Sequence, residues 1–550
     1  MRSSIASHLA RARPPHGEAG EVERVTGSQD IAPFLEDAAH VPGGHTHEVV
    51  FPRSEREVAD TLTSARSVLP VGAQSSLTGG ATPRGEIVLS TARFRAMRDA
   101  GEGRVRAGAG VTLVEIGVWL RARDAIYPPA PTFLGATVGG VVATNAAGAA
   151  TFKHGTTRAW VDAVTIVLAS GDVLDLRRGD CLAHPDGYID VELARGVTRV
   201  PIPQYAMPNV PKLSAGYFAS ARMDLIDLFI GAEGTLGVVT EATLRSQSPA
   251  PAACLAFVTF RDRVRALGFV AALRDAALRT WRSHDAFGLD VSAIEHMDAR
   301  SLSLLREDAV DTRLGIALDP EAAMGLLVTL DLAPGTTASD VYESFGSGSL
   351  ADGSGSGAQS PAIDDGPLAR FASLLAEFGA DDNVLIAPPG DVAGMDRLIA
   401  LREAVPIAVN ARVGRAQRDI DSRIEKTAAD VIVPFDRFGA LLDLYEDEWR
   451  RRGLDGAIWG HISDGNVHPN VVPRSFADVI AGREAALTFG REAMRLGGAP
   501  LAEHGVGRNA TKQQLLLELY GAEGLEQMRA VKRALDPEGK LAPGVLFSAR

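Results

Sequence analysis

The sequence predicts an α+β fold in two large parts, on three observations. First, 550 residues are too many for one hydrophobic core, because a domain typically holds roughly 100–200 residues. Second, short β runs alternate with amphipathic helices from Glu48 onward, and the helical segments lengthen past residue 250. Third, glycine accounts for 57 residues, and these glycines cluster between β runs instead of being spread evenly.

The composition excludes several classes of protein. A hydrophobic content of 46% and a charged content of 23% are typical of a globular chain. The net charge of −13 argues against nonspecific nucleic-acid binding, which needs a basic face. No apolar stretch approaches the ~18 residues of a membrane span. The two cysteines, Cys181 and Cys254, are too few for a four-cysteine zinc site or iron–sulfur cluster, and they favour a reducing compartment.

The elements of the first part follow in order along the chain. Residues 1–45 have weak periodicity and are expected to form a loosely ordered N-terminal extension, with a transit peptide left open. We then expect a helix over 58–69, a strand over 86–90, a strand over 105–108, a helix over 113–123, and a β run over 236–244. Between them, 162–176 predicts two strands joined at Ser170-Gly171 by a two-residue hairpin.

The second part mixes longer helices with strands such as 322–332. Residues 344–366 (SFGSGSLADGSGSGAQSPAIDDG) are of low complexity and predict a flexible surface loop.

Three glycine-rich segments indicate a large ligand contacted by main chain. They cover residues 71–80, 128–157 and 231–237. Small residues in sequence let backbone N–H groups point into one concavity that binds phosphate, although the first segment alone also fits a tight turn. No GxxxxGK[ST] is present, and the GxGxxA match at 505–510 lacks a strand–turn–helix unit. A nicotinamide site of the Rossmann type is therefore not expected.

Together these segments resemble the FAD-binding fold of the vanillyl-alcohol oxidase / p-cresol methylhydroxylase (PCMH) superfamily. Over residues 48–550 the chain looks like the FAD-linked D-2-hydroxyacid dehydrogenases that act on D-lactate, glycolate or D-2-hydroxyglutarate. Phe51-Pro52-Arg53-Ser54 resembles the segment with which the family's FAD-binding fold begins. Residues 212–237 resemble the segment that closes over the adenine half of FAD. The resemblance implies a two-subdomain PCMH-type FAD-binding domain over 46–248, a substrate (cap) domain of the FAD-linked-oxidase C-terminal type over 249–500, and a segment 501–550 that returns to the first domain.

The resemblance also implies which residues contact FAD. They are Gly72, Gln74, Ser75, Ser76, Leu77, Thr78, Gly79, Pro129, Pro131, Thr132, Gly135, Thr137, Gly139, Gly140, Asn145, Gly148, His154, Gly155, Thr157, Glu233, Gly234, Gly237 and Val238. The chain departs from the family at Ala73-Gln74 and at Ala147, where glycines are usual, and at His154, where tyrosine is common. The first loop contains no His or Cys, so FAD is expected to bind non-covalently.

A hairpin near the C-terminus predicts a metal site. His461 and His468 are seven residues apart and would point to opposite faces of one straight strand. Asp464-Gly465 is a two-residue hairpin signal that pairs the two histidines on one face, with Cβ atoms ~5 Å apart. Glu503 completes a set suited to Zn²⁺, or to Mn²⁺ or Fe²⁺. Two core histidines beside an ordinary turn are the alternative. The family's GHxGDGNxH and EHGVG motifs reinforce the metal interpretation, with Ser463 replacing a glycine.

The remaining site residues follow from the chemistry and the resemblance. His504, next to Glu503, is the candidate base for the 2-hydroxyl proton. Arg402 resembles the family's carboxylate-binding arginine, Lys426 lies in a segment that can carry a substrate-binding lysine, and Asn470 is a further substrate contact. The hydroxyglutarate pattern has lysine at the place of Ala428 and threonine at Pro406, so a second substrate carboxylate is not supported.

The sequence thus predicts FAD-dependent, metal-assisted oxidation of a lactate-like D-2-hydroxy acid to the 2-keto acid, with hydride transfer to flavin N5. Without iron–sulfur cysteines, electrons would pass directly from the flavin to a quinone, a cytochrome or an electron-transfer flavoprotein. An alkylglycerone-phosphate-synthase-like FAD transferase and a non-catalytic flavin-binding subunit are the alternatives. A cytoplasmic location is expected, with peripheral association at the inner membrane and a homodimer left open.

Overall fold

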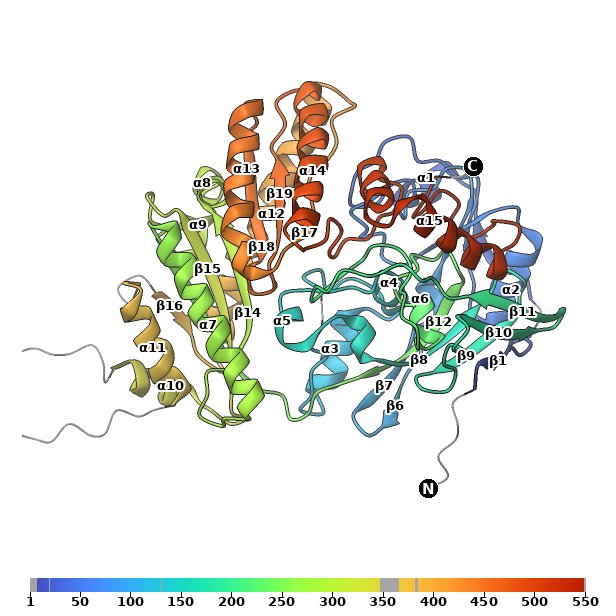
Figure 1. Cartoon of the computed structure of the whole chain (residues 1–550), viewed down its shortest axis with the longest axis horizontal. Coiled ribbons are helices and arrows are strands. Elements are labelled where there is room, and N and C mark those ends of the chain that lie inside the picture. Colours follow the sequence, from blue (N-terminus) through green and yellow to red (C-terminus); the bar gives the residue numbers. More distant parts are fainter. Residues whose placement is uncertain (1–6, 19, 130, 347–365, 381–383, 549–550) are drawn as a thin grey trace, which may run out of the picture.

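The computed structural model describes residues 7–18, 20–129, 131–346, 366–380 and 384–548 (Figure 1). Of the predicted flexible loop 344–366, residues 347–365 lie outside this described part, and Ser344 to Gly346 end a helix. Figure 1 shows two bodies side by side: the blue-to-green first half with the dark red C-terminal segment, and the remainder, coloured from yellow-green to orange-red. No helix within the described ranges combines the length and apolar character that crossing a membrane requires.

A four-stranded sheet opens the first half. Its order is β2 (Glu23–Val25), β3 (Val49–Phe51), β5 (Ile87–Ser90) and β4 (Val68–Val71), with β5 parallel to both neighbours β3 and β4. The helix predicted over 58–69 is α2 (Glu55–Ser64). It begins earlier because Ser54 caps it, accepting the N–H of Glu57, and it ends earlier because Leu69 belongs to β4.

An antiparallel five-stranded sheet lies beside the first. Its order is β6 (Met97–Gly101), β7 (Arg104–Gly108), β12 (Val238–Arg245), β8 (Val161–Val167) and β9 (Val173–Arg177). The predicted hairpin within 162–176 is present, but its loop has three residues, because Leu168 still hydrogen-bonds Asp172 across the turn. Gly171 has φ +84°, the left-handed conformation that such three-residue loops require.

The N-terminal segment is more ordered than predicted. β1 (Leu9–Arg11) pairs in parallel with β10 (Tyr188–Leu193), which pairs with β11 (Gly196–Pro201) in a three-stranded sheet. Together with β2, this makes the expectation of a loosely ordered extension wrong for these residues. The partner strand of β1 lies about 180 residues away, so local periodicity did not indicate that pairing.

The second half is built on a seven-stranded antiparallel sheet. Its order is β16 (Val384–Ala387), β13 (Ala252–Phe260), β15 (Met324–Leu332), β14 (Val291–Asp298), β18 (Gly456–His461), β19 (Asn466–Val471) and β17 (Val431–Ile432). Alternate residues of β13 face opposite layers. Cys254 and Ala256 pack with α7 (Arg263–Ser283), α13 (Phe438–Arg452) and α14 (Phe476–Arg495), whereas Leu255 and Phe257 pack with α8 (Ala299–Glu307) and α12 (Val392–Asp419).

Shorter helices complete both halves. They are α1 (Ser28–Ile31), α3 (Leu113–Arg121), α4 (Val138–Thr144), α5 (Thr151–His154), α6 (Ile226–Phe229), α9 (Val310–Leu314), α10 (Ala338–Gly346) and α11 (Pro367–Glu377). The last helix, α15 (Ala510–Leu535), kinks at Gly521. It packs Leu516, Met528 and Val531 into the core of the first half, and Leu541 then bridges to Val68 of β4. The chain therefore ends on the half in which it begins.

Candidate functional site

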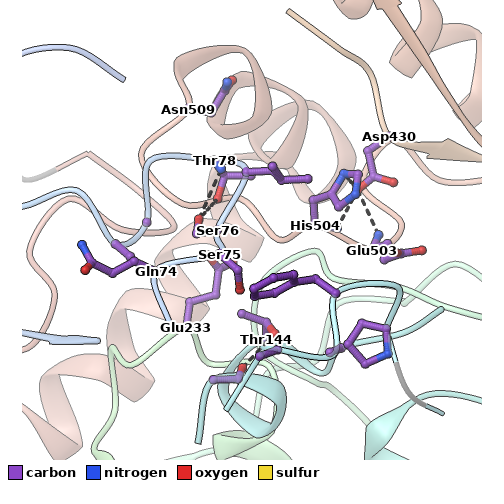
Figure 2. Close-up of a pocket in the computed structure, with 18 of the residues that line it drawn as sticks. Gln74, Ser75, Ser76, Thr78, Thr144, Glu233, Asp430, Glu503, His504 and Asn509 are labelled. Carbon is purple, nitrogen blue, oxygen red and sulfur yellow. Dashed lines mark hydrogen bonds and ion pairs between the residues drawn. The ribbon is translucent and has the colours of Figure 1, made fainter. Parts of the chain in front are cut away.

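A cavity of about 520 Å³ is lined by both halves (Figure 2). The first half lines it with the glycine-rich segments 70–81, 131–147 and 229–239. The second half contributes α12, the segment 425–430 and the β18–β19 hairpin, and the C-terminal segment contributes Glu503, His504 and Lys512. The three predicted loops and the predicted catalytic residues thus face one space.

The structure brings most, but not all, of the predicted FAD-contact residues to this cavity. Those that line it are Gly72, Gln74, Ser75, Ser76, Leu77, Thr78, Pro131, Thr132, Thr137, Gly139, Gly140, Glu233, Gly234, Gly237 and Val238. The predicted contacts that do not line it are Gly79, Pro129, Gly135, Asn145, Gly148, His154, Gly155 and Thr157. Asn145 and Thr157 hold the loop itself: Asn145 Oδ1 accepts the N–H of Arg158, and the Thr157 hydroxyl donates to Ala146.

The first two loops form a close-packed wall that fits an anionic cofactor. A Cβ at Gly72 would lie 2.3 Å from Thr137 Oγ1, so only glycine lets the two loops approach. Thr137 Oγ1 is buried and has no hydrogen-bond partner among the described residues. Ser75, Ser76 and Thr78, which also carry hydroxyls, line the same cavity (Figure 2). Phosphate oxygens are natural acceptors for such donors.

The predicted histidine hairpin exists with a different register. Trp459 pairs with His468, and His461 pairs with Asn466, so the predicted pairing of His461 with His468 is wrong by two residues. The turn has four residues because Ile462–Asp464 form a 3₁₀ turn that ends at Gly465, with φ +84°. A shift of two preserves the face, since side chains alternate with period two. The two imidazoles therefore still project together, with ring centroids 5.7 Å apart.

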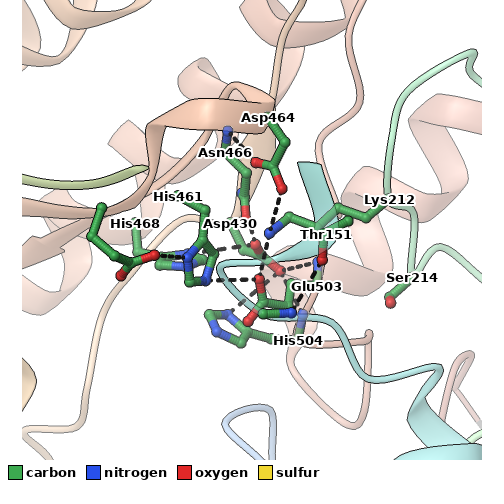
Figure 3. A network of polar contacts seen from close by, with 12 residues as sticks. Thr151, Lys212, Ser214, Asp430, His461, Asp464, Asn466, His468, Glu503 and His504 are labelled. Carbon is green, nitrogen blue, oxygen red and sulfur yellow. Dashed lines mark hydrogen bonds and ion pairs between the residues drawn. The ribbon is translucent and has the colours of Figure 1, made fainter. Parts of the chain in front are cut away.

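Glu503 joins the two histidines, as Figure 3 shows. One ligand atom from each of His461, His468 and Glu503 lies within 4.8 Å of the others. His461 Nε2 is 3.3 Å from Glu503 Oε2, and His468 Nδ1 is buried without a hydrogen bond to any described residue. Two imidazole nitrogens and one carboxylate oxygen, three ligands in all, fit a divalent cation such as Zn²⁺. Asp430, His468 and His504 form a second group of the same size.

Glu295 on β14 was not predicted, yet it connects two predicted residues. Its carboxylate accepts from Nε of Arg402 and from Nδ1 of His461, and it is buried. Burial would raise the pKa of this carboxyl, but the charges of Arg402 and His461 outweigh burial and lower it. Because Glu295 contacts Nδ1 of His461, the other ring nitrogen, Nε2, is directed at Glu503. Carboxylates commonly orient metal-binding histidines in this way.

Asp430, also not predicted, holds the His504 segment. Its Oδ2 accepts the backbone N–H of Glu503 at 3.0 Å and of His504 at 2.7 Å. The same carboxylate lies 3.4 Å from Nδ1 of His504 and 3.5 Å from Nδ1 of His468, and Lys512 Nζ approaches to 3.5 Å (Figure 3). One buried carboxylate thus holds the His504 backbone and lies close to both imidazoles.

Glu233 lines the cavity, as predicted, but its carboxylate binds protein. It accepts the N–H of Val506 at 2.9 Å and of Gly507 at 2.8 Å. The loop 503–507 is therefore hydrogen-bonded from both sides, by Asp430 of the second half and by Glu233 of the first.

Arg402, Lys426 and Asn470 all line the cavity. Among the described residues, Arg402 has one acceptor, Glu295 at Nε, so neither terminal nitrogen of its guanidinium is paired with protein. Lys426 has no ion-pair or hydrogen-bond partner in the described part of the chain, and burial lowers its pKa to about 8. Asn470 donates to the His468 carbonyl, and its Oδ1 is buried without a partner there.

Comparison with known proteins identifies the family of this chain. Residues 46–177 match the family "FAD binding domain", and residues 261–546, more than half of the chain, match "FAD linked oxidases, C-terminal domain". D-2-hydroxyglutarate dehydrogenase of Xanthomonas citri pv. viticola is 28% identical over 91% of this chain and 89% of that protein. D-lactate dehydrogenase of Anaerostipes hadrus is 26% identical over 87% of this chain and 83% of that protein.

Among solved structures, an alkyldihydroxyacetonephosphate synthase matches with a TM-score of 0.56 and 14% identity, covering 94% of this chain and 82% of that one. At this identity the likeness shows the fold alone. The order of an FAD-binding domain followed by an oxidase C-terminal domain confirms the predicted α+β PCMH-type fold. The chain belongs to the FAD-linked oxidase family.

Proposed function

We propose that this protein oxidises a D-2-hydroxy acid, lactate-like in size, to the corresponding 2-keto acid. The observation that carries the proposal is the convergence on one cavity of the FAD-loop residues, the His461–His468–Glu503 set, His504 and Arg402. The names of the relatives, D-2-hydroxyglutarate dehydrogenase and D-lactate dehydrogenase, support the same reaction class.

The substrate carboxylate would bind to Arg402. Two guanidinium nitrogens on one edge match the two oxygens of a carboxylate, and Glu295 already holds the Nε side of the fork. Lys426 and Asn470 supply a second cation and a free amide oxygen to the same cavity. We retain the monocarboxylic assignment because Ala428 and Pro406 occupy the positions at which the hydroxyglutarate pattern has lysine and threonine.

His504 would take the proton of the 2-hydroxyl. The Asp430 carboxylate contacts the backbone N–H and the ring Nδ1 of His504. Nε2 of His504 is then left to face the cavity that this residue lines. Bound FAD supplies the hydride acceptor for the C2 hydrogen. A divalent cation, Zn²⁺ first with Mn²⁺ or Fe²⁺ as alternatives, would be held by His461, His468 and Glu503 and would supply a Lewis acid for the hydroxyl oxygen.

Electrons would leave the flavin for a non-nicotinamide acceptor: a quinone, a cytochrome or an electron-transfer flavoprotein. Cys181 and Cys254 are both buried, and a [4Fe–4S] or [2Fe–2S] cluster typically needs four thiolates. We further propose that FAD is non-covalent, since the residue 72–80 loop offers neither His nor Cys. Acid precipitation of the yellow protein should then release free FAD into the supernatant.

The decisive test is anaerobic bleaching of the flavin absorbance by a panel of D- and L-2-hydroxy acids. D-lactate and similar monocarboxylic acids should bleach it, the L-enantiomers should not, and D-2-hydroxyglutarate should do so less efficiently. A protein that is colourless and takes up no added FAD, or a flavin that no 2-hydroxy acid reduces, would reject the proposed reaction.

A further inference from the structure

Lys212 is a buried cation to which the proposed reaction gives no task. It comes from the first half, in the segment between β11 and α6, and its side chain is 0% exposed. Its Nζ lies 2.7 Å from Oε2 of Glu503 and 3.2 Å from Oδ2 of Asp464 (Figure 3). The sequence resemblance placed this segment over the adenine half of FAD, but Lys212 does not line the cavity and points to the metal-ligand cluster instead.

We propose that Lys212 is a positioning residue for the metal site, which holds the Glu503 carboxylate in place for a divalent cation. This inference rests on the proposed metal set of His461, His468 and Glu503. It adds a residue from the FAD-binding half of the protein to a site whose two histidines lie on β18 and β19 of the second half.

Lys212 contacts one predicted ligand, Glu503, directly, and it is linked to the two histidines through Glu503 and Asp464. Glu503 Oε2, which Lys212 binds, also lies 3.3 Å from His461 Nε2, so the ammonium fixes the carboxylate beside the first histidine. Asp464, its other partner, belongs to the turn that joins the strands carrying His461 and His468. One side chain therefore ties the third ligand to the hairpin that bears the other two.

The residues on either side of Lys212 are packed and hydrogen-bonded to the second half and the C-terminal segment. Val210 and Leu213 pack against Ile432, Ala499 and Ala502, and the N–H of Ser214 donates to the Leu501 carbonyl at 3.2 Å. Residues that hold metal ligands in this way typically contribute ~10–100-fold to metal affinity or activity. The same magnitude is expected of Lys212.

A purely structural role is the competing interpretation. Asp464 and Lys212 are both fully buried, and removing one member of a buried ion pair leaves an uncompensated charge that destabilises the fold. Lys212→Met alone cannot separate the two roles. The double variant Lys212→Met/Asp464→Asn can, because it removes both buried charges. The side-chain amide oxygen that it leaves at position 464 can still accept the N–H of Asn466, as the Asp464 carboxylate does.

The experiment measures binding of Zn²⁺ to metal-free, FAD-loaded protein against a chromophoric chelator, together with the thermal midpoint and the flavin content. Lys212→Met should weaken zinc binding by ~10–100-fold. The double variant should regain thermal stability but keep the weakened zinc affinity. Lys212→Arg, which retains the cation, should recover part of that affinity, and flavin content should be unchanged throughout.

Lys153→Met is the matched control. Lys153 also comes from the first half and binds two carboxylates of the second, Asp290 at 2.8 Å and Asp331 at 2.6 Å, away from the predicted ligands. Its loss should lower stability without altering zinc affinity. Wild-type zinc affinity in the double variant would overturn the inference and make Lys212 a partner of Asp464 alone. Wild-type protein that binds no zinc would instead reject the metal site on which the inference rests.

Discussion

Asp430 contacts His504 twice, at the backbone N–H at 2.7 Å and at the ring Nδ1 at 3.4 Å. These two contacts fix both the position and the direction of the imidazole, and they leave Nε2 as the nitrogen available to a substrate. If His504 is the proposed base, it needs no rearrangement before it accepts a proton.

Replacing His504 with Ala should therefore slow substrate reduction of the flavin by ~10²–10⁴-fold, the usual contribution of a general base. Metal and FAD content should stay at wild-type levels, because His504 is outside both predicted sets. Stopped-flow absorbance of the flavin under anaerobic conditions measures the rate. An Ala variant that reduces its flavin at the normal rate would assign His504 a structural role.

Replacing His461, His468 or Glu503 with Ala should each remove bound metal and activity while FAD remains. The reason is spatial, since flavin affinity is expected from the loops at 72–80, 131–147 and 231–238 on the other wall of the cavity. Metal analysis beside flavin absorbance separates the two losses. His296→Ala is the control, because His296 is equally buried on β14 but does not line the cavity.

Chelation of the wild-type protein tests the same set without mutation. If the chelated enzyme still reduced its flavin at full speed, the two histidines would be core residues beside an ordinary turn.

Arg402→Ala should raise the Michaelis constant strongly, because it removes a charged contact to the substrate carboxylate. Breaking such a buried contact typically costs ~2–5 kcal/mol. Arg412→Ala on the same helix serves as the control, since Arg412 pairs with Asp308 at 2.8 Å and does not line the cavity. Steady-state kinetics of both variants measure this change in the Michaelis constant. Unchanged kinetics in the Arg402 variant would mean that the carboxylate binds elsewhere, with Lys426 as the next candidate.

The lowered pKa of Lys426 predicts that the Michaelis constant depends on pH. Burial lowers its pKa to about 8, so the side chain is cationic below that pH and neutral above it. If it helps to hold the substrate anion, the Michaelis constant should rise as the pH passes upward through about 8. Lys426→Arg stays charged across this range and should flatten the profile. A rise of the same size in the Arg variant would assign the titration to another group.

Features set by neighbouring residues were predicted better than contacts between residues far apart in the sequence. The histidine hairpin was predicted on the correct face because side-chain alternation is a local property, but its register was missed because the 3₁₀ turn adds two residues to the loop. Glu295 could not be predicted, since it meets Arg402 across 107 residues and no motif surrounds it.

The sequence around Asp430 and Lys212 gave only a weak indication that these residues matter to the site. Both lie in segments that resemble the family, next to residues singled out for other reasons, yet nothing in their neighbourhoods indicates the contacts with His504 and Glu503. Charged partners that come from different elements become visible only when the chain is folded.

The loop 503–507 has a thermodynamic consequence for the whole protein. Proteins of several domains commonly unfold in separate steps. Here Glu233 of one domain and Asp430 of the other hold the backbone of the same five residues, so neither domain can open without releasing it. Calorimetry should accordingly show one cooperative transition, and flavin fluorescence should appear at the same temperature. Glu233→Ala should weaken the coupling between the halves and broaden that transition, while the ion pairs of Lys153 and Lys212 still link them.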